Sequence, residues 1–437
     1  MASLTFLLLK VIPVLGIILI ILKIWSWFKA KKELQRQFKD FPGPKPHWLW
    51  GNAKELSGDY EGMLKIADYA VQYHGAFPIW MGPFDAFLMT VHPSTVKTVL
   101  SGSDPKDEFS YALMRPWIGD GLLLSGGRKW DRNRRLMTPA FHVDILKNYK
   151  KWQKANGSTE IFHHISLLTL DSMMQCLFGY HSNCQDERVR HPYIQGVYDV
   201  SEYIIKRIMS PHLHSDMIYY WTENGKKFQQ ACDTIHEHSS KIIAERRKLL
   251  AKEKTASRTT DFLDILLTAK DSDGDGLSNK EVQDEVDTFM FEGHDSTASS
   301  LSWCLYNLAK CPEYQDRCRE EIQQHWGDKE NITWDDLQKL EYTFMCIKES
   351  MRMFPPVPNI SRCTEKDITL PDGRVIPKAI FLMNCIGMQF ALTQIKIVIP
   401  MIIRKFHLEL DPEKPAQPES MLIMRAKNGL YLKINPL

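Results

Sequence analysis

Apolar residues recur at helical spacing along most of the chain, and the segment 279–309 is a long example. Its stripe consists of Val282, Val286, Met290, Leu301, Leu305 and Leu308. Ser278 and Glu281 form a capping box at its start, and Cys311-Pro312 predicts its end. The middle of the segment reads EGHDST, residues 292–297. A glycine among ionisable groups is unfavourable inside a helix, so the segment is either a solvated face or a helix that crosses a reaction site.

The same periodicity predicts a mainly α protein with a minor β part. Helices are expected at 60–73, 129–135, 161–178, 197–209, 226–252, 260–270, 311–326, 342–354 and 388–398. A capping box at Thr333–Asp336 predicts one more. Strands are expected at 77–81 and 87–91, which form a hairpin, at 368–370 and 375–376, and in a hairpin of 421–425 with 430–434 around Asn428-Gly429.

Residues 4–28 are nearly all apolar, which predicts a single N-terminal transmembrane helix within an anchor of residues 1–30. Lys10 lies near enough to the end to extend to the membrane surface. A cleaved signal peptide would need small residues where Trp25 and Trp27 stand. The basic residues that follow predict that the rest of the protein lies in the cytosol. A basic, proline-rich hinge at 31–50 leads to one domain at 51–437.

Composition and charge indicate the general class of protein and argue against some partners. The chain has 437 residues, 44% hydrophobic and 25% charged, which is normal for a globular protein with a sizeable core. Its net charge of +2 argues against nucleic acid as a partner. Nine scattered cysteines without a C-x-x-C spacing predict reduced thiols.

Two apparent metal motifs are interpreted as ordinary surface. The segment 271–276 resembles the start of a calcium loop, but Val282 stands at position twelve, where the bidentate glutamate belongs. We therefore expect an exposed turn there. The histidine pairs His212/His214 and His236/His238 lack further ligands at metal-site spacing and are expected at the surface.

Two further features gain meaning only together. Glu349 and Arg352 are three residues apart on one helix and can pair, either as a solvated pair or as a buried one. Cys385 precedes a helix, where the helix dipole favours a thiolate, which can serve as an axial haem ligand. Taken alone, Cys385 is better interpreted as an ordinary buried cysteine.

The order of these motifs resembles that of cytochrome P450 enzymes. The resemblance rests on the anchor, the proline hinge, Trp130-x-x-x-Arg134, EGHDST, Glu349-x-x-Arg352 and Asn384-Cys385-Ile386-Gly387, and on the segments GDGLLLSGG, TPAFH, KESMRMFPPVP and DGRVIP. FMFEGHDST is similar to family 4, the fatty-acid ω-hydroxylase group. The resemblance implies a cytochrome P450 fold, which is incomplete here because a segment before Cys385 is missing.

The resemblance also implies roles for residues around a haem cofactor. Cys385 would be the axial ligand of the iron, and Trp130, Arg134 and Arg362 would contact the haem propionates. Glu292 matches the glutamate that can be esterified to a haem methyl group. Glu349 and Arg352 match a buried structural pair beneath the haem.

On the oxygen side, Asp295 and Ser296 match an acid–alcohol pair that delivers protons to bound dioxygen, with Thr297 beside them. Gly293 would leave room for oxygen against the helix. The family commonly has threonine at the position of Ser296; serine keeps the hydroxyl but not the methyl group that restricts its rotamer.

The resemblance implies a monooxygenase that hydroxylates fatty acids or related long-chain lipids at or near the terminal carbon. Electrons would come from an NADPH-dependent cytochrome reductase, and the enzyme would be held by one span in the endoplasmic reticulum membrane. An exposed basic surface could steer the reductase. Its residues are Arg128, Lys129, Arg132 and Arg135.

The chain departs from the family between Lys378 and Cys385, where a strand, a meander with an arginine and the usual lead-in to the cysteine are missing. A second shortening follows Tyr149, and Pro400 should kink the last helix. Block losses of this kind are typical of a splice product or an incomplete gene model. The alternative function is therefore a haem-deficient variant that only binds the membrane or a partner.

Overall fold

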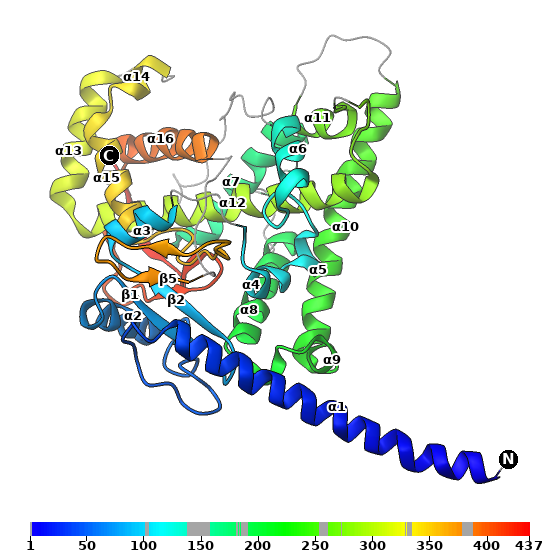
Figure 1. The fold of residues 1–437 in the computed structure, drawn as a ribbon. Coiled ribbons are helices and arrows are strands. Elements are labelled where there is room, and N and C mark those ends of the chain that lie inside the picture. The colour runs from blue at the N-terminus through cyan, green and yellow to red at the C-terminus, as the bar shows by residue number, and fades with distance from the viewer. Residues whose placement is uncertain are drawn as a thin grey trace.

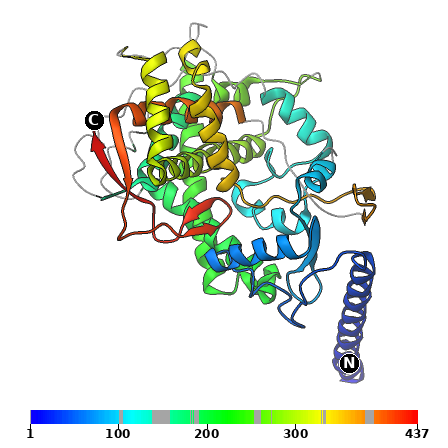
Figure 2. The ribbon, with the colours of Figure 1, turned by 90° about the vertical axis from the view of Figure 1, so that its left-hand side faces the viewer.

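The computed structural model describes residues 2–100, 105–137, 158–180, 182, 184, 191–252, 261–271, 273–327, 329, 334–377 and 388–437. Helices dominate, and the longest helix of the body, α12 (Asn279–Lys310), runs through its middle. Figures 1 and 2 show the other long helices around α12, with the small sheets gathered on one side. The predicted class, mainly α with a minor β part, is confirmed.

The helices of the first half are α1 (Ala2–Gln37), α2 (Tyr60–Gln72), α3 (Pro93–Leu100), α4 (Glu108–Ala112), α5 (Arg115–Ile118), α6 (Gly127–Met137), α7 (Ile161–Phe178), α8 (Pro192–Ile208), α9 (Asp216–Tyr219) and α10 (Glu223–Lys252). The second half adds α11 (Phe262–Thr268), α12, α13 (Pro312–His325), α14 (Trp334–Gln338), α15 (Glu341–Met353) and α16 (Met388–Lys405). The predicted helices are all present with small shifts at their ends. Thr333, the first residue of the expected capping box, lies outside the described residues.

The prediction for the central helix is confirmed. Ser278 Oγ accepts a hydrogen bond from the backbone N–H of Glu281, whose carboxylate accepts one from the N–H of Ser278. Both bonds satisfy donors that a helix N-terminus leaves free. Most side chains along α12 are buried, including those of His294 and Asp295. The interpretation of its middle as a solvated face is therefore wrong.

The described residues also form four small antiparallel sheets. The first pairs β1 (Ala76–Trp80) with β2 (Ala86–Thr90), which confirms the first hairpin. The others are β4 (Ile368–Thr369) with β5 (Val375–Ile376), β7 (Pro418–Ser420) with β8 (Met424–Ala426), and a sheet in which β9 (Tyr431–Pro436) lies between β3 (Ser158–Glu160) and β6 (Phe406–Leu410).

The predicted C-terminal hairpin is wrong in its pairing. Asn428-Gly429 does form a turn, with Gly429 at φ 85°. However, β8 pairs back to β7, and both edges of β9 are taken by β3 and β6. Alternating apolar residues show which face of a strand is buried but do not specify its partner.

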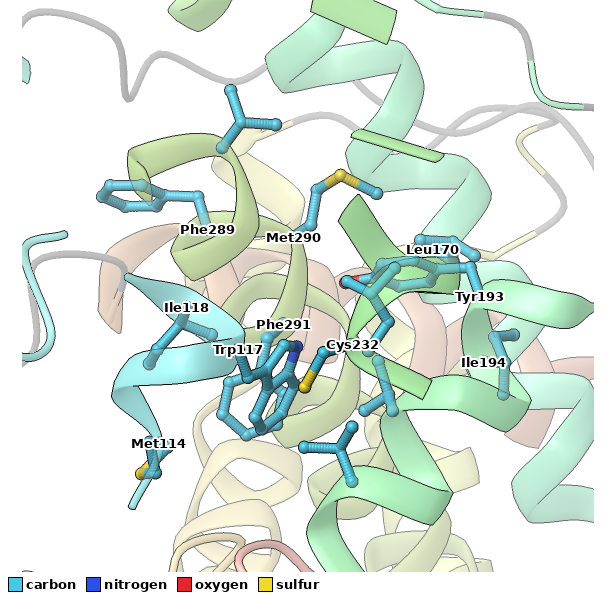
Figure 3. Close-up of a cluster of buried hydrophobic side chains, with 14 of the residues drawn as sticks. Met114, Trp117, Ile118, Leu170, Tyr193, Ile194, Cys232, Phe289, Met290 and Phe291 are labelled. Atoms are coloured by element: carbon cyan, nitrogen blue, oxygen red, sulfur yellow. The ribbon is translucent and has the colours of Figure 1, made fainter. Parts of the chain in front are cut away.

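Two large apolar clusters flank α12. The first packs the N-terminal half of α12 against α5, α7, α8 and α10, where the ring of Trp117 lies against that of Phe291 (Figure 3). The second packs its C-terminal half against α13, α15, α16 and the β9 sheet. Burial on both sides fixes the position of the EGHDST segment between the clusters.

The N-terminal helix α1 projects from the body (Figure 1) and has 36 residues. It continues through Gln37, so the first part of the segment interpreted as a hinge is helical. Over the residues that the structure describes, no helix reaches the length and apolarity that crossing a bilayer requires.

Candidate active site

An apolar cavity of about 290 Å³ lies against the middle of α12. Its walls come from the β1–β2 hairpin, α2, the end of α8, and the segments 357–361 and 420–423. Six of its lining residues are methionines: Met63, Met81, Met89, Met114, Met209 and Met421. On the α12 side, the wall is formed by Phe291, Glu292 and Ser296.

Among the described residues that line this cavity, Glu292 is the only one with a carboxylate. Burial raises the pKa of Glu292 to about 7, and the nearby ammonium of Lys106 opposes that rise. Its side chain therefore exchanges a proton close to neutral pH. The sequence points to Glu292 only through the family resemblance. The structure adds a physical reason for its raised pKa, which is burial.

Lys106 was missed by the sequence interpretation. Its Nζ donates to the carbonyl oxygens of Leu122 (2.7 Å) and Ser125 (3.2 Å), and burial lowers its pKa to about 8. A β-bridge joins Lys106 to Arg362, so two basic residues stand beside the Glu292 side of the cavity. A single lysine in a loop carries no sequence signal that would have marked it.

The two predicted hydroxyls have different positions. Ser296 lines the cavity, and its Oγ donates to the carbonyl oxygen of Glu292 at 2.7 Å. Thr297 is 1% exposed and donates to the carbonyl oxygen of Gly293 at 3.1 Å. Of the two, only Ser296 presents its hydroxyl at the cavity wall.

Asp295 is fully buried and does not line the cavity. Its Oδ2 accepts from the guanidinium of Arg425 on β8 at 2.6 Å. Arg425 in turn lies over the ring of Tyr198, 3.6 Å from its centre. Arg425 was also missed from the sequence, because only the fold brings β8 against α12.

The expected role of Gly293 as a space for oxygen stays a prediction. A Cβ at this position would meet Sδ of Met173 on α7 at 2.5 Å. Gly293 is absent from the described cavity wall. The missing side chain therefore gives room to the side chain of Met173.

Comparison with known proteins decides the family. The sequence model of cytochrome P450 matches residues 41–381. The chain belongs to the cytochrome P450 family.

Named relatives place this P450 in family 4. It is 39% identical to human cytochrome P450 4F11, over 95% of this chain and 93% of that protein. It is 38% identical to the human ultra-long-chain fatty acid omega-hydroxylase (92% and 89%) and 37% identical to mouse leukotriene-B4 omega-hydroxylase 3 (98% and 95%). The protein is therefore a P450 monooxygenase, an oxidoreductase.

The comparisons also bear on the missing segment. The match to the first of these relatives extends over 491 aligned positions, although this P450 has only 437 residues, so parts of the relative have no counterpart. The family match ends at residue 381, before Cys385. Cys385 itself lies outside the described residues.

The family implies a haem, and the described residues suit its carboxylates. Trp130 and Arg134 lie on one face of α6, with the guanidinium of Arg134 5.5 Å from the Trp130 ring centre. Lys106 and Arg362 add positive charge beside Glu292. Indole and cationic donors of this kind are what propionate groups bind.

The pair Glu349–Arg352 forms, but it is not buried as expected. Their carboxylate and guanidinium are 2.7 Å apart, while the two side chains are 55% and 71% exposed. The reason is helical spacing: α15 turns Thr343, Ile347 and Ser350 inward, which leaves the pair on the opposite face.

Two residues of the basic surface predicted on α6 form ion pairs with acidic residues of the same chain. Lys129 pairs with Asp120, and Arg132 donates to Asp271 at 2.7 Å. The bond to Asp271 holds the segment at 271–276, whose residues 273–276 form an exposed turn, as predicted. Arg128 is exposed, and the side chain of Arg135 lies outside the described part.

The prediction of surface histidines is wrong for three of the four. His212 is exposed. His214 is half-buried, and its Nε2 lies 3.0 Å from the carbonyl oxygen of Ile208. His236 and His238 are half-buried because α10 packs against α8 and α12. Spacing alone cannot tell a solvated histidine from one at a helix interface.

Proposed function

We propose that this P450 hydroxylates fatty acids or related long-chain lipids at or near the terminal carbon, using dioxygen and electrons from an NADPH-dependent reductase. The observation that carries the proposal is the methionine-rich cavity that ends on Glu292 and Ser296 of α12. The relatives named as fatty acid and leukotriene omega-hydroxylases support it.

The cavity lining favours an extended apolar chain. Methionine side chains are unbranched and polarisable, so six of them can adapt to a flexible substrate. Among its described lining residues, no lysine, arginine or histidine occurs. A lining that is apolar and without cations favours the methyl end of a lipid, so we place the methyl end toward α12 and the acid end away from it.

The haem would be held by the residues named above: Cys385 as thiolate ligand, Trp130, Arg134 and Arg362 at the propionates, and Glu292 through an ester. When bound, the haem supplies oxygen activation and insertion of one oxygen atom into a C–H bond. Around it, Ser296 Oγ stands at the cavity wall, and Asp295 holds a carboxylate oxygen behind it. We assign proton delivery to this pair, because breaking an O–O bond consumes protons in a site closed to bulk water.

We further propose that α1 attaches the enzyme to the endoplasmic reticulum membrane as a single span, with the catalytic domain in the cytosol. Large apolar side chains of α1 are exposed, among them Val14, Ile17, Ile21, Leu22 and Trp25. Exposed apolar surface of this extent is unfavourable in water. Deleting residues 1–30 should release the protein from carbonate-washed membranes.

Product analysis tests the reaction. The purified protein, reconstituted with an NADPH-dependent reductase, is given saturated fatty acids of graded chain length, and products are separated by mass spectrometry. We expect hydroxyl groups at the terminal or adjacent carbon. Hydroxylation spread along the middle of the chain would contradict the proposed orientation with the methyl end toward α12.

Acid–acetone extraction tests the ester at Glu292. Haem should remain with the wild-type polypeptide and be extracted from Glu292→Gln. Complete extraction from the wild-type holoprotein would rule out the ester while leaving the proposed reaction intact.

A haem-deficient, non-catalytic variant is the second candidate. It is favoured by the exposure of the Glu349–Arg352 pair and by the family match that ends before Cys385. Such a protein would bind membranes or a partner but would not incorporate haem during expression with added haem precursor.

A further inference from the structure

A column of aromatic and imidazole rings leads from the surface between α8 and α10 to the middle of α12. The rings of His191 and His238 are 5.3 Å apart, those of His238 and Tyr193 are 5.3 Å apart, and those of Tyr193 and His294 are 5.6 Å apart. His238 is half-buried, whereas Tyr193 is 1% exposed and His294 is fully buried. The column therefore connects the surface with the residue next to Asp295.

Several polar atoms along this column lack a hydrogen-bond partner among the described residues. They are His238 Nε2, Tyr193 Oη, His294 Nε2 and Asp295 Oδ1. A buried polar atom without a partner is costly, and buried groups of this kind usually bond to internal water. All four atoms belong to the ring column or to the residue next to its inner end.

The bonds that do exist orient the column. His294 Nδ1 lies 2.6 Å from the carbonyl oxygen of Met290, which can only accept, so Nδ1 carries the proton and Nε2 is left as an acceptor. Asp295 uses Oδ2 for Arg425, so that Oδ1 is the oxygen left for another donor. Both free atoms belong to neighbouring residues of α12.

The ring groups are neutral at physiological pH. Burial lowers the pKa of His238 to about 4 and lowers the pKa of His294, while burial raises the pKa of Tyr193. The charged groups around the column are already engaged: Asp287 accepts from Ser239 and Gln283, and Asp295 pairs with Arg425. Lys241 stands at the outer end, near His238. Neutral hydroxyl and imidazole groups can both accept and donate, which suits relay of a proton.

We propose that His238, Tyr193 and His294 line a hydrated path that carries protons from the surface to Asp295. The path rests on the monooxygenase reaction proposed above, because that reaction consumes the protons. A proton enters at the outer end and moves inward through water and the Tyr193 hydroxyl, each of which accepts one proton and releases another, until Asp295 Oδ1 receives it. His294 Nε2 only accepts a hydrogen bond from this water, because Nδ1 is held by the carbonyl oxygen of Met290. No electron moves along the path, so charge and atoms balance at every transfer.

Radiolytic hydroxyl labelling of the full-length holoprotein tests the hydration directly. Water held next to a buried side chain allows its oxidation, so Tyr193 should be modified despite its 1% exposure. Phe178, also 1% exposed but in an apolar setting, should remain unmodified. Protection of Tyr193 equal to that of Phe178 would overturn the proposal.

A pair of tyrosine variants tests the proton path. Tyr193→Phe removes the hydroxyl, and Tyr219→Phe is a matched control because Tyr219 is 1% exposed with an unpartnered hydroxyl elsewhere in the core. We expect Tyr193→Phe to lower product per NADPH by about tenfold, with more peroxide and a larger solvent isotope effect. Tyr219→Phe should match the wild type.

Equal coupling and equal isotope effects in the two variants would overturn the path. A wild-type holoprotein that forms no hydroxylated lipid would instead contradict the proposed function, and the labelling of Tyr193 would still report whether the column is hydrated.

Discussion

The same chemical pair, a carboxylate with an arginine, occurs in two contrasting environments. On α12, Asp295 is fully buried and Arg425 is 12% exposed in its side chain, with their atoms 2.6 Å apart. On α15, Glu349 and Arg352 are just as close, at 2.7 Å, but more than half of each side chain is exposed. Distance alone would rank the pairs as equals.

The difference shows that the α12 pair is built into the core, whereas the α15 pair is a solvent-exposed contact on the outer face of its helix. Around α12, further buried acids also have fixed partners: Glu285 accepts from the backbone of Leu122 and from Asn133. An ion pair in water is worth little, while a buried charge that loses its partner is strongly unfavourable.

The largest effect is expected from the two arginines. Arg425→Ala should lower the free energy of unfolding by about 3–5 kcal/mol, because it leaves Asp295 charged and buried without a cation. Arg352→Ala, its matched control, should cause no measurable change. Urea unfolding at neutral pH measures both. A loss for Arg352→Ala as large as that for Arg425→Ala would show that the α15 pair is buried after all.

The next effect concerns pH. The folded protein holds the proton of Glu292 up to a pKa of about 7, while the ordinary value is 4.5. The free energy of unfolding should therefore fall as pH rises from 4.5 to about 7, by on the order of 3 kcal/mol from this group. Glu292→Gln should lack that part of the pH dependence, as measured by urea unfolding of the haem-free protein, in which the Glu292 carboxyl is free, across this interval.

Glu349→Gln is the matched control for the pH experiment. The hydrogen bond from Arg352 lowers the pKa of Glu349, so any stabilisation is present at neutral pH and lost in acid, the opposite sign. If Glu292→Gln changes the pH profile no more than Glu349→Gln does, the carboxyl of Glu292 is solvated.

The smallest effect tests the cavity. Met421 lines it, whereas Met217 on α9 is 76% exposed. Met421→Trp should shorten the space and lower kcat/KM for the longest accepted fatty acid by about tenfold, with less effect on shorter ones. Met217→Trp should leave the chain-length preference unchanged. Equal preferences in both variants would place the substrate elsewhere.

Much of the fold could be predicted from the sequence because helical periodicity and capping are local. The ends of α12 and the β1–β2 hairpin follow from neighbouring residues. The partner of β9, the burial of His236 and the exposure of Glu349 do not, because each depends on which elements pack together in space.

The residues of the candidate site also differ in whether they could be predicted from the sequence. Glu292 and Ser296 were identified through a family resemblance, and both line the cavity. Lys106 and Arg425 were missed because each reaches α12 from a segment distant in sequence. Gly293 was assigned to oxygen by the resemblance, and the structure adds Met173 as its neighbour. A sequence shows that a glycine is needed but not which atom approaches it.

The spectrum of the reduced, CO-bound protein tests most directly whether this chain holds haem beneath α12 through Cys385. The account predicts a thiolate-type Soret shift in the wild type and its loss in Cys385→Ala. A purified, folded wild-type protein without that shift would contradict the account. The second candidate, a haem-deficient protein that only binds membranes or a partner, would then remain.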